Sequence, residues 1–560
     1  MIRFRQLLKQ GLGSEREAPP RGANVPLPRN GPLFLFQQPW ERSYRCCLLV
    51  ITLAIVCLTS ADGLAQNRGK GGKRPRDVAS FRRQHAERRA KFAAQLNELA
   101  RTCDEKGLPE AAAEIRQLSR PVEPSELRLT AFPRQVQPAL PQSLPAEERA
   151  WRVKLRAHQL DYSKELYALS KRAADAGHVG LALDLIREIM LHDSDHVNAR
   201  RILGFKRSGN EWVSTFEAEM QKNKMVWTEM FGWLPRDHVE RYEHGERYYK
   251  PRKAWISAAK EAELRQDWLN AWEIKTEHYL VKTNHSLERG VDLAKKLEDF
   301  HGLFFQMMSG FFNSSAEVKQ LFAGSSGRIA TPKNVVHYYR TRREYIAVLK
   351  PETTQPIEIT RGIYFPRNKI AFFFYDPESD DDSTLYHEAT HQLLSGSRPT
   401  TAEIGIKSDF WLIEGIACYM ESFRRDGDKF SVGDPGHQRL RAARMHFVDE
   451  NYYMPLQEFT RMGMDMFQRA PQIRKNYSQG AALTHFFLHY DEGRYREALI
   501  EHLSQIYSPT KAVRDNPESL AELTGVDDEE LDRQFGDYIR QLAPSAKMAP
   551  APAAVDSEEP

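Results

Sequence analysis

The residues best suited to chemistry are His387, Glu388 and His391, which form the pattern H-E-x-x-H. On a helix, residues four apart lie one turn apart on the same face, so both imidazoles can reach one metal ion. The glutamate then lies beside that ion, where its carboxylate can take a proton from a metal-bound water. Zinc in hydrolytic sites takes three protein ligands and keeps one position for water. The pattern therefore predicts a zinc centre, and Glu414 is our candidate for the third ligand.

The sequence around Glu414 supports this assignment. We expect a helix from Phe410 to Phe423, in which the small residues Gly415 and Ala417 would let two helices approach closely around an ion. The alternative is that the two histidines are ordinary surface or core residues and that the glutamate is a carboxylate favoured at a helix start. The short motif alone does not decide between these interpretations.

Two further groups accompany the predicted centre. Glu421 follows Glu414 by seven residues and so lies on the same helix face, where it could orient a ligand, substitute for one, or face solvent. His485 and His489 form a second pair four residues apart, which could bind metal itself. Because no carboxylate between them could serve as a base, we expect His485 to face the active site or the core and His489 to face water.

The motif followed by W-x-x-E-G-x-A (Trp411 to Ala417) resembles the gluzincins, zinc peptidases whose ion is held by two histidines and one glutamate. Within that group the chain is similar to the peptidase MA-like proteins, especially a secreted family of the DUF1570 type that is common in planctomycete bacteria. The resemblance extends from about Trp272 to Tyr490. It implies a zincin-like fold of a small sheet and active-site helices, with zinc on the two histidines and Glu414 and with Glu388 as general base.

The same resemblance bears on other positions. Tyr477 in Tyr477-Ser478-Gln479-Gly480 is similar to a Tyr-x-x-Gly of related aminopeptidases, whose tyrosine hydrogen-bonds the tetrahedral intermediate. The resemblance thus implies that Tyr477 stabilises the oxyanion. The Gly-Ala-Met-Glu-Asn signature that binds a free amino terminus in those enzymes is missing, which favours an endopeptidase. Cys418 stands where some gluzincins have an aspartate that supports a ligand histidine.

These residues must be positioned by a mixed α+β domain. We expect strands over 273–281 and 335–339, helices over 286–308 and 342–349, and a hairpin over 357–364 and 369–375. The last strand, Ile370 to Tyr375, comes just before the H-E-x-x-H helix. It could be an edge strand that pairs with an extended substrate backbone. The alternative is a strand buried in the core.

The first 65 residues are predicted to direct export. The apolar run Cys46 to Thr59 has the length of a signal-peptide core and is short for a spanning helix. Gly63-Leu64-Ala65 has small residues where a signal peptidase prefers them, so cleavage would leave a chain that begins at Gln66. The region before the apolar run is unusually long, and residues 46–59 could instead be an uncleaved anchor. We expect a periplasmic or extracellular protein, free or anchored.

Composition and patterning divide the remainder of the chain. The 560 residues carry a net charge of +4, from 80 basic and 76 acidic residues, so no overall charge favours nucleic acid. Residues 66–93 are rich in Arg and Lys and are predicted to be disordered. Residues 94–220 should be helical, in part similar to a tetratricopeptide repeat. A peptidase-like domain is expected over 270–540, and the tail over 545–560 is predicted to be disordered.

Two functions remain after this reasoning. The first is an exported zinc peptidase that hydrolyses a peptide or protein substrate with a metal-activated water. The second is a catalytically silent envelope protein whose metal is structural and whose helical region binds a partner. A silent site has no need of a base, so the presence of Glu388 favours the peptidase.

Overall fold

The computed structural model describes residues 78–119, 127–325, 332–353, 356–379, 381–398, 404–469 and 471–542. The apolar run 46–59, the cleavage site after Ala65 and the tail 545–560 lie outside these residues. Among the helices of the described residues, none has the length and apolar character needed to cross a membrane.

A five-stranded sheet forms the centre of the described structure, in the order β11–β12–β10–β9–β8. Its strands are β8 (Trp272–Lys275), β9 (Tyr279–Thr283), β10 (Asn334–Tyr339), β11 (Gly362–Phe365) and β12 (Ile370–Phe374). The three inner strands run parallel, and each edge strand is antiparallel to its neighbour. The fold is mixed α+β, as predicted.

Three strand predictions need correction. The first strand of the hairpin, expected over 357–364, is limited to β11, because Ile357–Ile359 form a short 3-10 helix. The single strand expected over 273–281 is the hairpin β8–β9, whose turn is closed by the backbone bond from Thr276 N to Tyr279 O at 3.0 Å. That turn contains neither Gly nor Pro, so the alternating pattern concealed it. The strand β12 is not an edge strand, because β11 pairs with one side of it and β10 with the other. The alternative, a strand in the core, is confirmed.

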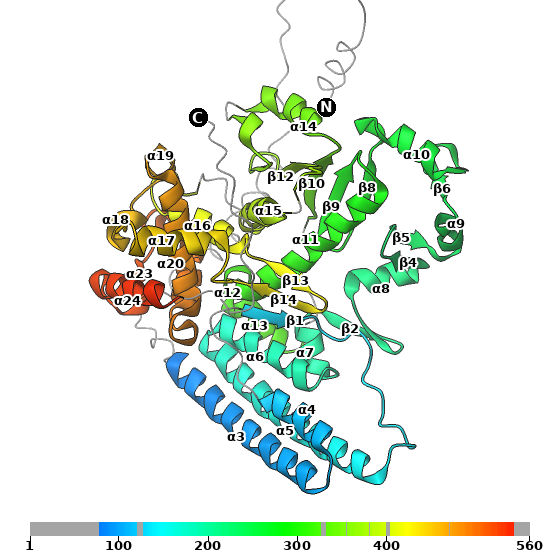
Figure 1. Ribbon diagram of the computed structural model, residues 1–560, viewed down its shortest axis with the longest axis vertical. Helices are drawn as coiled ribbons and strands as arrows, with labels where there is room; N and C mark the ends of the chain where they lie inside the picture. Colours follow the sequence, from blue (N-terminus) through cyan, green and yellow to red (C-terminus); the bar gives the residue numbers. More distant parts are fainter. Residues whose placement is uncertain are drawn as a thin grey trace, which may run out of the picture. The chain divides into compact units, whose positions relative to one another are not determined.

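Helices cover this sheet and carry the predicted site. Helix α11 (Leu287–Met307) lies where the sequence predicted it and begins after Ser286, whose hydroxyl accepts a hydrogen bond from the Arg289 N–H. Helix α14 (Arg342–Leu349) also matches its prediction. Helix α15 (Ser383–Gly396) contacts β11, β12 and β10 and packs against α16 (Phe410–Met420), as Figure 1 shows.

Helix α16 also packs closely on α20 (Ile473–Gly493). The contact depends on Gly415, where an added Cβ would lie 2.5 Å from the carbonyl oxygen of Gly480 and 2.7 Å from the Thr484 hydroxyl. Gly415 therefore permits a close helix contact, but the contact is with α20 and not with α15, the helix that carries the two predicted histidine ligands. Three further helices pack on α20, namely α17 (Gln438–Val448), α21 (Arg496–Ile506) and α24 (Asp528–Gln541).

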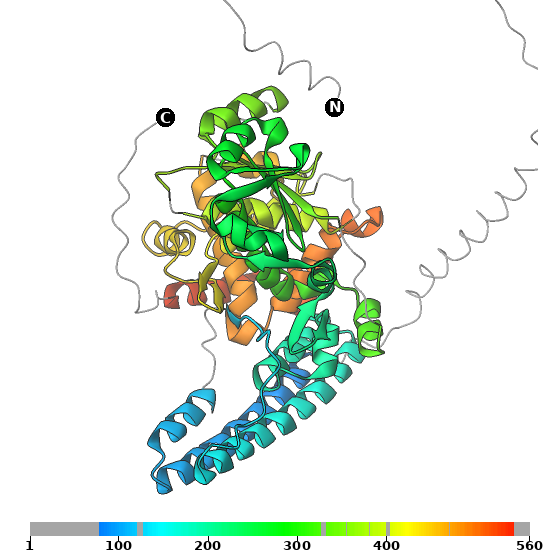
Figure 2. The same cartoon turned by 90° about the vertical axis from the view of Figure 1, so that its right-hand side faces the viewer.

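Long helices form the N-terminal part of the described chain, where Figure 2 shows α3 beside α5. The helices are α3 (Val78–Glu105), α4 (Pro109–Ser119), α5 (Ala146–Ala176), α6 (Val179–His192) and α7 (Val197–Ile202). The prediction of disorder over 66–93 is wrong from Val78 onward. Phe81 and Phe92, about three helical turns apart, are buried on one face of α3, so its basic residues occupy a folded helix.

Three consecutive hairpins, each followed by a short helix, connect this helical part to the sheet. The hairpins are β2–β3 (Phe205–Ser208, Glu211–Ser214), β4–β5 (Met225–Thr228, Gly232–Pro235) and β6–β7 (Glu246–Tyr249, Ala254–Ser257). The helices are α8 (Thr215–Lys222), α9 (Val239–Glu243) and α10 (Ala258–Arg265). Our sequence reasoning missed this repeat. Its signal is a tryptophan at the second position of each returning strand: Trp212, Trp233 and Trp255.

Candidate metal centre

The structure brings the three predicted ligands together. The Nε2 atoms of His387 and His391 lie 3.2 Å apart, and Glu414 Oε2 lies 3.4 Å from the first and 3.7 Å from the second. Tetrahedral zinc, with bonds of about 2.0–2.1 Å, holds its ligand atoms about 3.3 Å apart. The two imidazoles and the carboxylate therefore lie at separations that fit three ligands of one zinc ion.

Local structure explains this convergence. One turn of α15 separates the two histidines, and α16 presents Glu414 from the opposite side. Burial would raise the pKa of the Glu414 carboxyl, but the adjacent His391 and His387 outweigh it and hold that pKa far below its ordinary value. The carboxylate is thus ionised in the state that a metal ligand requires.

Glu421 orients one of the ligands. Its Oε1 lies 2.9 Å from Nδ1 of His387, while Arg439 donates to the two carboxylate oxygens over 2.8 and 2.9 Å. Although burial raises it, these hydrogen bonds lower the pKa of Glu421 to about 2, so the group stays ionised and accepts the Nδ1 proton. That tautomer leaves the lone pair on Nε2, which points to the metal position. Of the three roles considered for Glu421, the geometry supports the first.

Cys418 lies on the same side of His387, with its sulfur within 4.8 Å of the ligand atoms of His387 and Glu421. It is a free, fully buried thiol, and burial raises its pKa. Three residues further along, Glu421 is the carboxylate that lies 2.9 Å from Nδ1 of His387.

The predicted base is held by the sheet. Glu388 Oε2 accepts a hydrogen bond from the backbone N–H of Tyr364 at 2.8 Å. Tyr364 belongs to β11, the edge strand beside α15, and its N–H points away from β12. This contact fixes one carboxylate oxygen of Glu388 and was not foreseen from the sequence, because it depends on which strand occupies the edge.

Tyr477 lies on α20, where its ring packs edge-on against Phe467 and lies 5.9 Å from the Arg439 guanidinium. Burial, and after it the negative charge of Glu414, raise the pKa of Tyr477 well above its ordinary value. The hydroxyl therefore keeps its proton at neutral pH and can act as a hydrogen-bond donor.

The second histidine pair has a different environment from the one predicted. His485 Nε2 donates to the Gly433 carbonyl at 2.9 Å, and its Nδ1 accepts from the Tyr538 hydroxyl at 2.6 Å. His489 Nε2 and the Tyr419 hydroxyl share a hydrogen bond of 2.7 Å, and His489 is buried, so the expectation that it faces water is wrong. Neighbouring helices cover α20 on several sides, so little of its surface reaches solvent and His489 lies under them. His485 belongs to the core, and its bonded nitrogens give no support for a role at the metal centre.

A second group of potential ligands consists of His278, Glu298 and His301. The two imidazole rings are stacked with centroids 3.7 Å apart and planes at 16°. Lone pairs in nearly parallel rings cannot converge on one ion, whereas the rings of His387 and His391 lie at 72°. The chemistry of the donor atoms therefore favours the centre on α15 and α16.

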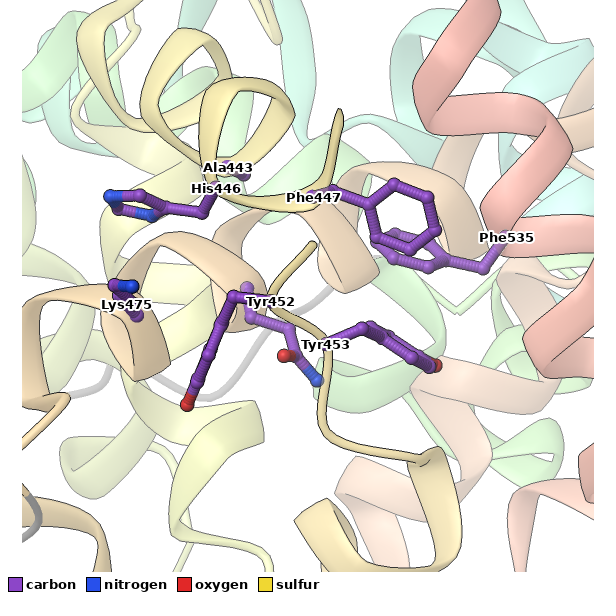
Figure 3. A pocket seen from close by; sticks show the side chains of 8 residues that line it. Ala443, His446, Phe447, Tyr452, Tyr453, Lys475 and Phe535 are labelled. Carbon is purple, nitrogen blue, oxygen red and sulfur yellow. The ribbon is translucent and has the colours of Figure 1, made fainter. Parts of the chain in front are cut away.

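A small pocket lies between α17, α20 and α24, lined by Ala443, His446, Phe447, Tyr452, Tyr453, Lys475, Gln479 and Phe535 (Figure 3). Its volume of about 10 Å³ accommodates roughly one water molecule. None of the predicted site residues lines it, so it is not a substrate site for the centre described above.

No protein-family model matches the chain, and no curated protein matches it.

Proposed function

We propose that the protein is a zinc-dependent peptidase with an endopeptidase preference. The observation that carries the proposal is the convergence of His387, His391 and Glu414 beside a carboxylate, Glu388, that is anchored but is not a ligand. A metal centre with only a structural role would use four protein ligands and would have no need of such a base. The antiparallel edge strand β11 next to the ligand helix is consistent with a zincin-like arrangement.

Bound zinc would lower the pKa of its water to about 7 and polarise the scissile carbonyl. Glu388 takes the proton of the attacking water on the carboxylate oxygen that Tyr364 leaves available, and then transfers it to the departing amine. The Tyr477 hydroxyl, which keeps its proton, donates a hydrogen bond to the developing oxyanion. Glu421 keeps His387 in the tautomer that the ion requires.

The substrate class proposed is an extended peptide. Strand β11 pairs with β12 along one side only, and on its other side the Tyr364 N–H bonds Glu388, so strand addition would use the remaining backbone groups of β11. Such pairing uses main-chain hydrogen bonds and tolerates varied side chains. Export to the periplasm or the exterior, as the apolar run 46–59 suggests, would place the enzyme with envelope or external proteins.

The test is a digest of a diverse library of internally quenched peptides by the zinc-loaded protein. We expect cleavage within peptides, its loss on chelation, and its return when zinc is added. The Glu388→Gln variant serves as the matched control, because it changes one atom of the base and none of the ligands. Equal cleavage by this variant and by the wild type would refute the mechanism.

A further inference from the structure

We propose that Arg439 is a positioning residue of the metal centre, which acts through Glu421 on the ligand His387. The inference rests on the zinc site proposed above and adds a residue that the motif does not contain. Arg439 lies in the first turn of α17, an element with no ligand of its own.

The chain needs such a residue because of where its supporting carboxylate lies. Glu421 follows the last residue of α16, and its backbone N–H still bonds the Ala417 carbonyl at 3.2 Å. Position 418, one turn after Glu414 inside the helix, is occupied by a neutral thiol. The carboxylate thus comes from the end of the helix, where backbone hydrogen bonds constrain a side chain less than in the middle.

Arg439 supplies the missing constraint. Its Nε donates to Glu421 Oε2 at 2.8 Å and its Nη2 donates to Oε1 at 2.9 Å. This two-point contact fixes the plane of the carboxylate as well as its position. Oε1 is also the atom that lies 2.9 Å from Nδ1 of His387. The orientation of the imidazole is therefore linked to the guanidinium through a single shared oxygen.

Charge gives a second reason for the pair. Glu421 is only 7% exposed, and a buried carboxylate without a cationic partner is costly. Arg439 supplies a compensating positive charge 2.8 Å from the Glu421 carboxylate. Without the guanidinium, the carboxylate would gain by turning away toward solvent, and the imidazole would lose its fixed tautomer. Arg439 also lies over the ring of Tyr477, 5.9 Å from its centroid, so the ligand and the proposed oxyanion donor share one neighbour.

The test is a double-mutant cycle on the full-length protein. Zinc affinity is measured for each variant by competition with a chelator. We expect Arg439→Gln to weaken zinc binding about 10- to 100-fold, the usual effect of removing such a supporting group. Glu421→Gln should weaken it similarly, and the double variant should be no worse than Glu421→Gln alone. Arg439→Lys should recover only part of the loss, because an ammonium cannot make the two-point contact.

Arg444→Gln is the matched control, because Arg444 is exposed on the same helix. It should leave zinc affinity unchanged. The zinc affinities are compared at a temperature at which thermal unfolding shows every zinc-free variant to be folded, so that a loss of affinity in Arg439→Gln reports positioning rather than unfolding. Additive losses in the double variant, or wild-type affinity in Arg439→Gln, would overturn it. Zinc retained in a His387→Ala, His391→Ala double variant would instead refute the metal centre itself.

Discussion

Tyr364 donates its backbone N–H to Glu388 across 2.8 Å, and this bond joins the edge of the sheet to α15, the helix that carries the proposed ligands His387 and His391. It holds one oxygen of the base without placing any charge beside it. With zinc bound as proposed, this bond would hold Glu388 off the ion, although the residue lies between the two proposed ligands in the sequence. It also makes the backbone of β11, rather than a side chain, the support of the base.

The first prediction concerns that base. Glu388→Gln should retain zinc, since the amide can still accept the Tyr364 hydrogen bond and no ligand is changed. Hydrolysis should fall by about 10²–10⁴-fold, because a general base commonly contributes that much. Metal content and initial rates on a cleavable peptide check both parts. Loss of zinc from this variant would show that Glu388 is a ligand.

The second prediction concerns the ligands. We expect one zinc per chain by elemental analysis, and Glu414→Ala should lose zinc affinity and activity together. The matched control is the double variant His278→Ala, His301→Ala, which removes the other histidine pair and should retain the full zinc content. If the control loses zinc and Glu414→Ala retains it, the ion is held by the stacked pair.

Tyr477→Phe provides the third prediction. The ring and its packing on Phe467 remain, so zinc content should be that of the wild type. The rate should fall by about 10²–10³-fold, the usual effect of losing one oxyanion donor. Because the hydroxyl is expected to act on the transition state, the loss should be in kcat with little change in KM. A change in KM alone would assign Tyr477 to substrate binding.

The fourth prediction addresses the contact between α16 and α20. Gly415→Ala would bring a Cβ within 2.5 Å of the Gly480 carbonyl oxygen, so α16 must move and carry Glu414 with it. We expect a loss of about 1–3 kcal/mol in the free energy of unfolding, together with weaker zinc binding. Gly302→Ala on α11 is the control, since nothing lies within 4 Å of its added Cβ. Unfolding in denaturant compares the two.

The fifth prediction concerns pH. Burial, with a smaller effect of the Lys282 charge, lowers the pKa of His337 to about 4. The unfolded value is about 6.5, so the folded state binds fewer protons below that pH. The contribution of His337 to the free energy of unfolding is therefore fully present above pH 6.5. It is lost as the pH falls toward 4, and the loss is at most about 3 kcal/mol.

The His337 effect is measured by denaturant unfolding of the zinc-free protein at pH 7 and pH 4.5. His337→Phe should lose less stability between these two values than the wild type loses. The exposed His244→Phe should leave the wild-type difference unchanged. An equal pH dependence in wild type and His337→Phe would contradict the assignment.

Local periodicity was enough to predict the parts of the site that depend on one helix. Two histidines four residues apart share a face on any α-helix, so the arrangement on α15 follows from the sequence. The small residues beside Glu414 likewise indicated a close helix contact, which Gly415 makes with Gly480. The sheet strands were predicted where their apolar pattern was continuous, as over β10 and β12.

Tertiary structure alone decided what depends on a neighbour. The sequence of β12 alone left open whether the strand lies at an edge or in the interior, and its position was decided by pairing with β11 and β10. His489 is buried because the helices around α20 leave no solvent face for it. The role of Glu421 depends on Arg439, which lies on another helix at a distance that no local period encodes. A local sequence pattern predicts which residues share one face of a helix or strand. Which other element packs against that face depends on the free energy of packing the whole chain.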